Sequence, residues 1–419
     1  MRPLPQQRAG QPLRIALLSY RSKPHCGGQG VYVRNLSREL VDLGHRVEVF
    51  SGQPYPDVDP GVVLRRLPSL DLYRDEDPFR PPPIRQWRDG IDALEVALMS
   101  TAGFPEPLTF SLRAARELRN RAGSFDVVHD NQGLGYGLLG IRAAGYPVTA
   151  TIHHPISVDQ RIELAQAAGW KRKLSLRRWY GFVRMQGRVA RRIAPIITAS
   201  RSAARDISTE FGVSPSRVRV VPLGVDTDEF HPRPRPREAG RIVAVASADT
   251  PLKGIDTLVR AVAKLATERE VSLTVVGRPS PRTERLIGEL SVDDRVGFVE
   301  GIDGAAVAER LSGAEIAVVP SLYEGFSLPA VEAMASGTPL VATKTGALPE
   351  VTGDAAVLVP PGDVEELRSA LAGLLDQPSR REALGRAGLQ RVRERFTWRA
   401  AAQATVRCYR EAIAREGPC

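Results

Sequence analysis

Residues 321–342 decide the fold, and they read Ser321-Leu322-Tyr323-Glu324-Gly325-Phe326-Ser327-Leu328-Pro329-Ala330-Val331-Glu332-Ala333-Met334-Ala335-Ser336-Gly337-Thr338-Pro339-Leu340-Val341-Ala342. An apolar run, 316–319, precedes the segment, and a helical pattern extends through Ala335 before a second apolar run at 339–342. The segment therefore predicts a strand, a loop, a helix and another strand. Such alternation is typical of a parallel sheet covered by helices.

The same alternation extends over the rest of the chain and predicts two doubly wound α/β domains. The predicted strands are 14–20, 46–50, 126–129, 147–153 and 193–199 in the first half, and 241–246, 271–276, 295–299, 315–319, 339–342 and 356–359 in the second. A chain of 419 residues also exceeds the size of a single core, which stops growing at about 250–300 residues. The segment 54–88, rich in proline and acidic residues, is expected to be an irregular surface excursion.

The predicted domains are 1–222 and 237–398, joined by a proline-rich linker at 223–236. The helical pattern at 399–416 is expected to pack back near the first domain. Tandem doubly wound domains bind ligands at the carboxyl ends of their strands, so a central cleft between the domains is the expected site.

The net charge of +10 is confined to the first half of the chain. Residues 1–222 hold 33 Lys and Arg against 20 Asp and Glu, whereas 223–419 hold 25 against 28. This asymmetry points to an anionic partner for the first half. The composition excludes a disordered, collagen-like or disulfide-scaffold protein. Three cysteines, no signal-like start and no long apolar run predict a cytoplasmic protein.

Glu324 and Glu332 are the strongest functional candidates. They bracket a helix start, where free amides of Gly325, Phe326, Ser327 and Leu328 can bind phosphate. At eight residues apart the carboxylates are expected on nearly one helical face, where they can bind the hydroxyls of two ring systems. A general acid/base couple and two glutamates on a solvated helix are the alternatives.

Two candidates in the first domain follow predicted strands. Gly28 and Gly30 precede a helix and allow a ligand to approach the backbone, although an ordinary glycine turn explains them equally well. His153 ends a strand, where it can bind a polar substrate or can simply be structural; His129 raises the same question.

The segment 321–342 resembles the glutamate-pair motif of family 4 glycosyltransferases. Three more segments resemble the family in the same order: 221–230, 253–258 and 345–351. The resemblance covers almost the whole chain and implies the GT-B fold, a sugar-nucleotide donor, retention of anomeric configuration and no metal or other cofactor.

The resemblance also implies a role for each matching residue. Glu324 would contact the donor sugar, Glu332 the ribose, and the amides of 325–328 the diphosphate. Lys253 would neutralise the diphosphate and its leaving-group charge. Gly28 and Gly30 would approach the phosphate from the first domain, and His153 would approach the transferred sugar.

One position departs from the family pattern. Ser247 stands where the family usually has an arginine before the lysine, and Asp249 adds negative charge beside it. Arg278, after the next strand, and an arginine of the first domain are the candidates to compensate. Asp-x-Asp triplets such as 57–59 and 226–228 lie in irregular segments, so no metal is assigned to them.

The span 164–205 contains eleven basic and no acidic residues. Arg177, Arg184, Arg188 and Arg191 share one side of an expected amphipathic helix. The helix can pack on the sheet with solvated arginines, lie on an anionic membrane surface, or bind an acceptor phosphate. Nucleic acid is not expected, because no aromatic platform accompanies the charge.

The sequence therefore predicts a retaining hexosyltransferase that uses a sugar nucleotide and an acceptor hydroxyl, with a lipid-linked or anionic acceptor at a membrane surface as the expected partner. A GT-B phosphorylase, a sugar-nucleotide epimerase and an inactive sugar-nucleotide-binding scaffold are the alternatives.

Overall fold

The computed structural model describes residues 11–22, 28–74, 77–246 and 250–416. The chain forms two compact units. Unit 1 comprises Met1–Ala199, Ala203–Val221 and Ala402–Cys419, and unit 2 comprises Ser200–Ser202 and Pro222–Ala401. The residues expected to form a linker, 223–236, thus belong to unit 2, and most of the last helix belongs to unit 1.

Unit 1 is built on a parallel sheet of seven strands in the order β3-β2-β1-β4-β5-β6-β7. The order reverses beside β1, which gives the sheet a switch point where doubly wound folds bind ligands. The strands are β1 (Arg14–Ser19), β2 (Arg46–Ser51), β3 (Val63–Arg66), β4 (Val127–Asn131), β5 (Val148–Thr151), β6 (Ile196–Thr198) and β7 (Val218–Val220).

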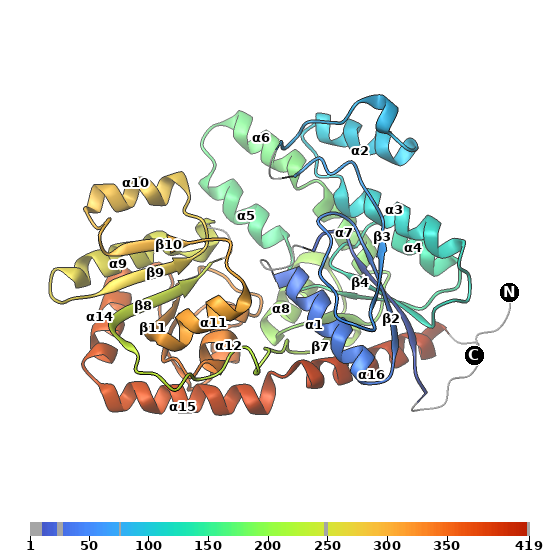
Figure 1. The fold of residues 1–419 in the computed structure, drawn as a ribbon. Helices are drawn as coiled ribbons and strands as arrows, with labels where there is room; N and C mark the ends of the chain where they lie inside the picture. The colour runs from blue at the N-terminus through green and yellow to red at the C-terminus, as the bar shows by residue number, and fades with distance from the viewer. Residues whose placement is uncertain (1–10, 23–27, 75–76, 247–249, 417–419) are drawn as a thin grey trace. The chain divides into compact units, whose positions relative to one another are not determined.

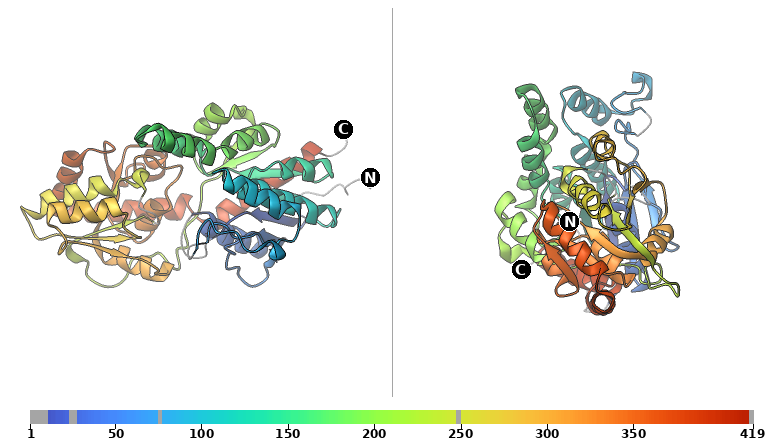
Figure 2. Two further views of the ribbon diagram at one scale, coloured as in Figure 1. Left: turned by 90° about the horizontal axis from the view of Figure 1, so that it is seen from above. Right: turned by 90° about the vertical axis from the view of Figure 1, so that its left-hand side faces the viewer.

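Helices cover both faces of the unit 1 sheet (Figures 1 and 2). Apolar side chains of α3, α4, α7 and α8 form one core with β1, β4 and β5, and α1 and α16 pack on the opposite face. The helices are α1 (Gly28–Asp42), α2 (Gly90–Ser100), α3 (Glu106–Arg119), α4 (Gly137–Ala143), α5 (Ser157–Gln166), α6 (Trp170–Trp179), α7 (Phe182–Ala190), α8 (Arg201–Phe211) and α16 (Trp398–Glu416).

Unit 2 is built on a parallel sheet of six strands in the order β10-β9-β8-β11-β12-β13. Its switch point lies between β8 and β11. The strands are β8 (Glu238–Val245), β9 (Ser272–Val276), β10 (Val296–Val299), β11 (Ala314–Val319), β12 (Leu340–Thr343) and β13 (Ala356–Val359).

The helices of unit 2 also form two layers (Figure 1). Helices α9 (Ile255–Ala266), α10 (Pro281–Leu290) and α14 (Val364–Leu375) pack together on one face. Helices α11 (Gly304–Gly313), α12 (Leu328–Ala335), α13 (Leu348–Thr352) and α15 (Pro378–Arg395) pack on the other. This arrangement follows from right-handed crossovers that leave the switch point in opposite directions.

All eleven predicted strands are present, and the α/β class with two doubly wound units is confirmed. Two strands were missed. β3 lies inside the segment expected to be irregular, and β7 directly precedes the expected linker. Both are short edge strands with exposed or half-exposed residues, so neither produces a buried apolar run.

Two expectations about helices were wrong. The basic segment does not form one helix, because α6 ends at Trp179 and α7 begins at Phe182, with Tyr180 and Gly181 between them. Glu324 precedes α12 by four residues and is not helical, so the periodicity argument does not place it on one helical face with Glu332.

Candidate active site

The loop that carries Glu324 follows β11, at the switch point of the unit 2 sheet. Backbone hydrogen bonds hold it from two neighbouring segments: Leu322 N–H donates to the Leu252 carbonyl at 2.7 Å, and Ala347 N–H donates to the Glu324 carbonyl at 2.9 Å. The Thr345 hydroxyl donates to the Leu322 carbonyl at 2.9 Å. The loop is therefore fixed by the segments around residues 252 and 346, both of which carry motifs in the sequence.

Two glycines allow these segments to approach the loop. Gly254 has φ +65°, and a Cβ atom there would lie 2.1 Å from the Pro320 carbonyl oxygen. Gly346 has φ +50°, and a Cβ atom there would lie 2.2 Å from the Glu324 carbonyl oxygen. Both positions need a left-handed backbone as well as space that only glycine leaves.

Lys253 and Glu324 form an ion pair, with Nζ 2.8 Å from Oε1. The Ser321 hydroxyl donates to the same oxygen at 2.7 Å. The Glu324 side chain is 10% exposed and the Lys253 side chain 28%, so the pair lies at the surface of the unit with limited access to water. These contacts orient the carboxylate and place a fixed positive charge beside it.

Helix α12 begins directly after this pair. Its N-cap residue, Ser327, has φ +89°, and its buried hydroxyl has no hydrogen-bond partner among the described residues. Phe326 is buried against Phe396, which fixes the turn between Gly325 and Leu328. A helix start presents unpaired amide groups and a positive dipole end, which suits a phosphate group.

Glu332 lies one turn into α12 and is half-buried. Within the described part of the chain, it forms no ion pair. Burial, together with repulsion from Glu229, raises the pKa of Glu332 to about 7. A carboxylate in this setting is stabilised by hydrogen-bond donors such as sugar hydroxyls.

In unit 1, Gly28 and Gly30 are the first and third residues of α1, and Gly30 is buried. His153 follows β5, and its Nε2 donates to Asn131 Oδ1 at 2.9 Å. Burial and the neighbouring His154 lower the pKa of His153 to about 3, so its ring is neutral near pH 7. With Nε2 as the donor, Nδ1 can accept a hydrogen bond.

His129 is a structural residue, which was one of the two alternatives for it. It is fully buried, with Nδ1 2.7 Å from the Tyr409 hydroxyl and Nε2 2.7 Å from the Thr151 hydroxyl. The Tyr32 hydroxyl also contacts Thr151, at 2.9 Å. This network joins α1 and α16 to the sheet and leaves neither ring nitrogen for a ligand.

The remaining candidates that the structure describes lie on exposed surfaces. Arg278 is 78% exposed and pairs with Glu300, while Ser247 and Asp249 lie outside the described residues. The four candidate arginines of the basic segment are exposed: Arg177, Arg184, Arg188 and Arg191. Two of them bind locally, since Arg188 donates to the Tyr136 hydroxyl and Arg191 to the Phe211 carbonyl.

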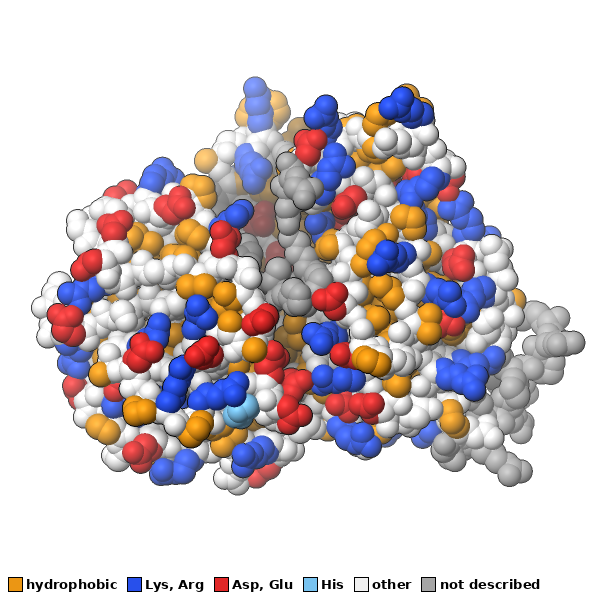
Figure 3. All heavy atoms as spheres, viewed as in Figure 1, with side chains coloured by type: hydrophobic (Ala, Val, Ile, Leu, Met, Phe, Trp, Pro, Cys, Tyr) orange, Lys and Arg blue, Asp and Glu red, His pale blue; other side chains and the backbone are white. Residues whose placement is uncertain are grey.

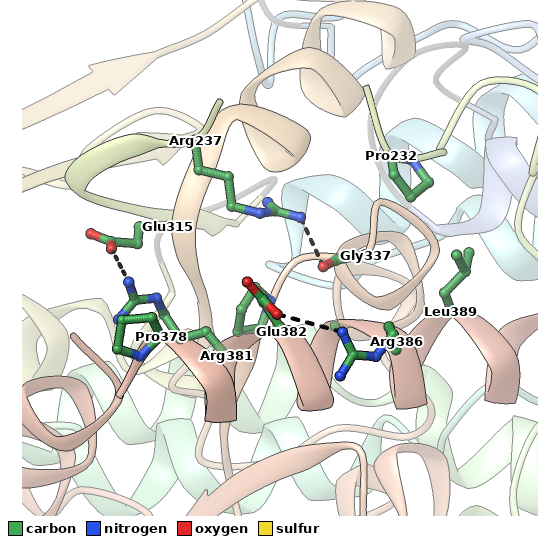
Figure 4. Close-up of a pocket in the computed structure, with 11 residues that line it drawn as sticks. Pro232, Arg237, Glu315, Gly337, Pro378, Arg381, Glu382, Arg386 and Leu389 are labelled. Carbon is green, nitrogen blue, oxygen red and sulfur yellow. Dashed lines mark hydrogen bonds and ion pairs between the residues drawn. The ribbon is translucent and has the colours of Figure 1, made fainter. Parts of the chain in front are cut away.

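A hollow of about 480 Å³ lies at the opposite edge of the unit 2 sheet, near the amino ends of β8, β11 and β12 (Figure 4). Its charged groups already have partners. Arg237 donates to carbonyls that include Gly337 at 2.8 Å, and Arg381 pairs with Glu315 at 2.6 Å. The hollow therefore serves to anchor α15 and is not assigned as the donor site.

The sequence did not single out Ser321, Gly254 or Gly346 as site residues, although all three lie in quoted motifs. Ser321 precedes Glu324 by three residues, Gly254 follows Lys253, and Gly346 follows Thr345. Their roles depend on how closely the backbones of neighbouring loops approach one another. The spacing of residues along the chain does not show this.

No group of three or more His, Cys, Asp or Glu residues with metal-binding geometry occurs in the described ranges. Across those same ranges, no helix is long and apolar enough to cross a membrane.

Two doubly wound units with a glutamate, lysine and helix start at the second switch point define the GT-B class of glycosyltransferases. A family model described as "Glycosyltransferase Family 4" matches residues 26–229, and one described as "Glycosyl transferases group 1" matches residues 226–391. The chain belongs to the family 4 glycosyltransferases and is a transferase enzyme.

Similar proteins span the full chain. The MMP alpha-(1->4)-mannosyltransferase of Mycolicibacterium hassiacum is 57% identical over 97% of this chain and all of its own length. D-inositol 3-phosphate glycosyltransferase 2 of Catenulispora acidiphila is 30% identical over 96% of each chain.

Solved structures give the same fold. Sucrose-phosphate synthase of Thermosynechococcus elongatus is similar with a TM-score of 0.73 and 26% identity, covering 96% of this chain and all of its own. Anabaena HepE in complex with UDP and glucose has a TM-score of 0.69 at 16% identity, covering 94% and 98%.

Substitution of Gly346 by alanine tests the packing of the Glu324 loop. We expect Gly346→Ala to lower the free energy of unfolding by more than about 1 kcal/mol, because the new Cβ atom meets the Glu324 backbone. Gly301→Ala is the matched control, since Gly301 has φ +72° with nothing within 4 Å of a Cβ atom. Thermal unfolding measures both, and equal losses would contradict this account of the loop.

Proposed function

We propose that the protein is a retaining mannosyltransferase, which moves a mannosyl group from a sugar nucleotide to an acceptor hydroxyl. The observation that carries the proposal is the Lys253–Glu324 ion pair beside the start of α12. The 57% identity to an alpha-(1->4)-mannosyltransferase supports mannose as the sugar and α-(1→4) as the linkage.

In this proposal the donor lies along the edge of unit 2. Amides of 325–328 bind the diphosphate, and Lys253 neutralises the charge that develops as the diphosphate leaves. Glu324 accepts hydrogen bonds from the donor sugar, while Glu332 accepts them from the ribose. A fixed lysine and a helix start supply the positive charge for which other transferases use a metal ion, so we propose metal-independent transfer.

Retention follows, in this proposal, from front-face attack by the acceptor hydroxyl. The bond from the anomeric carbon to the diphosphate oxygen breaks, the acceptor oxygen bonds to the same face, and the acceptor proton passes to the leaving diphosphate. Neutral His153 of unit 1 accepts a hydrogen bond from the transferred sugar. Gly28 and Gly30 allow the phosphate to approach the backbone at the start of α1.

The basic segment of unit 1 is proposed to bind an anionic group, either a lipid headgroup or an acceptor phosphate. Helix α6 suits this role better than α7. Only Leu176 of α6 is buried, and the helix exposes Trp170 (71%) and Leu174 (51%) among its basic side chains. Figure 3 shows Lys and Arg side chains over the part of unit 1 that carries α6. An apolar and cationic surface of this kind is typical of peripheral membrane contact.

Removal of the Lys253 charge tests the catalytic assignment. We expect Lys253→Met and Glu324→Gln each to lower kcat by about 100-fold or more. Lys253→Met removes charge stabilisation of the transition state, and Glu324→Gln weakens the contact with the donor sugar. Lys264→Met is the control, because Lys264 forms an exposed pair with Glu365 in the same unit.

The assay measures transfer from UDP-, GDP- and ADP-mannose to mannosides. Full activity of Glu324→Gln would contradict the assignment. Sugar release that needs inorganic phosphate but no acceptor would instead favour a phosphorylase.

The raised pKa of Glu332 predicts pH-dependent donor binding. Hydroxyl donors favour the ionised carboxylate, so donor affinity should fall as the pH drops below about 7, approaching tenfold for each pH unit. Glu332→Gln should bind more weakly at pH 8 and show a flat profile. Calorimetry with an intact nucleoside diphosphate mannose from pH 5.5 to 8 measures this, and parallel profiles for the two proteins would contradict it.

Vesicle binding tests the proposed role of α6. We expect co-sedimentation with anionic vesicles and much less with neutral ones, because the exposed cations of α6 need a negative surface. Double substitution of Trp170 and Leu174 by serine should reduce binding several-fold, whereas serine at Val63, an exposed apolar residue of β3, should not. Equal and negligible binding to both vesicle types would contradict membrane contact. An acceptor phosphate would then remain as the proposed ligand of the basic segment.

A further inference from the structure

The loop that follows β4 adopts a backbone conformation that its residues do not favour. Gln132 and Leu134 have φ +57° and +50°, in the left-handed region that glycine adopts most readily. Both residues are buried, with 3% and 0% of their surface exposed. Backbone strain persists only where the surrounding contacts impose it, and it is concentrated at functional sites. The contacts of this loop therefore show what the strained conformation achieves.

Hydrogen bonds from three elements hold the loop in place. The Asp130 carboxyl group, in β4, accepts the Leu134 N–H at 2.8 Å. Gln132 N–H donates to the Thr151 carbonyl at the end of β5, at 2.9 Å. From α7, Gln186 Nε2 donates to the Gln132 carbonyl at 3.1 Å and to the next carbonyl at 3.3 Å. The loop is therefore rigid at the carboxyl ends of β4 and β5, where doubly wound sheets bind ligands.

Gln132 uses its side-chain amide to hold the backbone that carries His153. Its Oε1 accepts the His153 N–H at 2.8 Å, and its Nε2 donates to the His154 carbonyl at 3.2 Å. A neighbouring strand would offer the same acceptor and donor to an extended segment. Because β5 ends at Thr151, the Gln132 amide extends this pairing beyond the end of the strand. The position of the His153 backbone thus depends on Gln132.

Asn131 holds the ring of the same histidine. Asn131 is fully buried, and its Oδ1 lies 2.9 Å from His153 Nε2, while its Nδ2 lies 3.5 Å from Ser19 Oγ. The Tyr32 ring packs edge-on against the imidazole, with the ring centroids 4.8 Å apart. An amide oxygen can only accept a hydrogen bond, so it selects the tautomer of a neutral ring that carries its proton on Nε2.

We propose that Asn131 and Gln132 are positioning residues for sugar transfer, with Gln132 fixing the backbone of His153 and Asn131 fixing its ring in the Nε2–H tautomer. This inference rests on the proposed function, in which His153 accepts a hydrogen bond from the transferred sugar. Nδ1 is the acceptor that this tautomer leaves. A ring that is oriented before the donor binds needs no reorganisation during the reaction, which is the benefit that the strained loop provides.

NMR of the imidazole nitrogens, in ligand-free protein labelled at histidine, tests the tautomer. The chain has six histidines, and His153→Ala assigns the His153 signals by their loss. The wild-type ring should carry its proton on Nε2. Asn131→Leu removes the acceptor and should give a mixture of tautomers, whereas Asn131→Asp keeps an acceptor there and should keep the proton on Nε2. A wild-type ring protonated on Nδ1, or an unchanged ring in Asn131→Leu, would overturn the role of Asn131.

A double-mutant cycle tests whether both residues act through His153. Asn131→Leu and Gln132→Met should each lower kcat by about tenfold and change the KM for the donor by less than about twofold, because the contact acts in the transition state. In a His153→Ala background, neither substitution should lower kcat further. Losses that add in that background would indicate a structural role alone and would overturn the inference.

Thr149→Val is the matched control for both measurements. Thr149 is buried in β5, and its hydroxyl donates to the Pro195 carbonyl at 2.8 Å, so valine removes a buried hydrogen bond from the same strand. This variant should unfold at a lower temperature with unchanged kcat and unchanged His153 signals. If it lowers kcat as much as Asn131→Leu does, the effect of the loop is one of stability, and the inference is wrong.

The proposed function can fail separately from this inference. Wild-type kcat in Asn131→Leu and Gln132→Met would overturn the inference and leave the proposed function intact. Absence of transfer from every nucleoside diphosphate mannose would contradict the proposed function. The tautomer measurement, which needs no substrate, would then decide whether Asn131 orients the ring.

Discussion

The ion pair between Lys253 and Glu324 is the contact on which the proposed donor site depends. It joins two loops that are 71 residues apart in the sequence, and it forms only because the backbone at Gly254 and Gly346 lies against the Glu324 loop. The pair positions both groups before any ligand arrives. The proposed mechanism relies on charge rather than on a side-chain nucleophile, so it needs such preorganisation.

The fold could be predicted from the sequence because buried parallel strands leave continuous apolar runs. The two missed strands, β3 and β7, are exposed edges whose pairing depends on neighbours rather than on their own residues. The break between α6 and α7 was missed because the helical pattern continues across Tyr180 and Gly181. The chirality of the crossovers then settles which face each helix covers.

The candidate site was predictable in its residue types but not in its contacts. Glu324, Glu332 and Lys253 were identified from motifs, whereas the Ser321 hydroxyl and the close approach of Gly346 appear only when the loops are folded. His153 and His129 show the same limit. His129 lies within β4 and has both ring nitrogens bonded in the core. His153 follows β5, and among the described residues its ring is hydrogen-bonded at Nε2 alone.

The anomeric configuration of the product tests the account most directly. Proton NMR of the disaccharide formed from a nucleoside diphosphate α-mannose and methyl α-mannoside should show a new α-linked mannosyl residue. That outcome is what the proposed front-face attack, with Lys253 at the leaving diphosphate, produces. A β-linked product would contradict the account, because it would require attack from the opposite face.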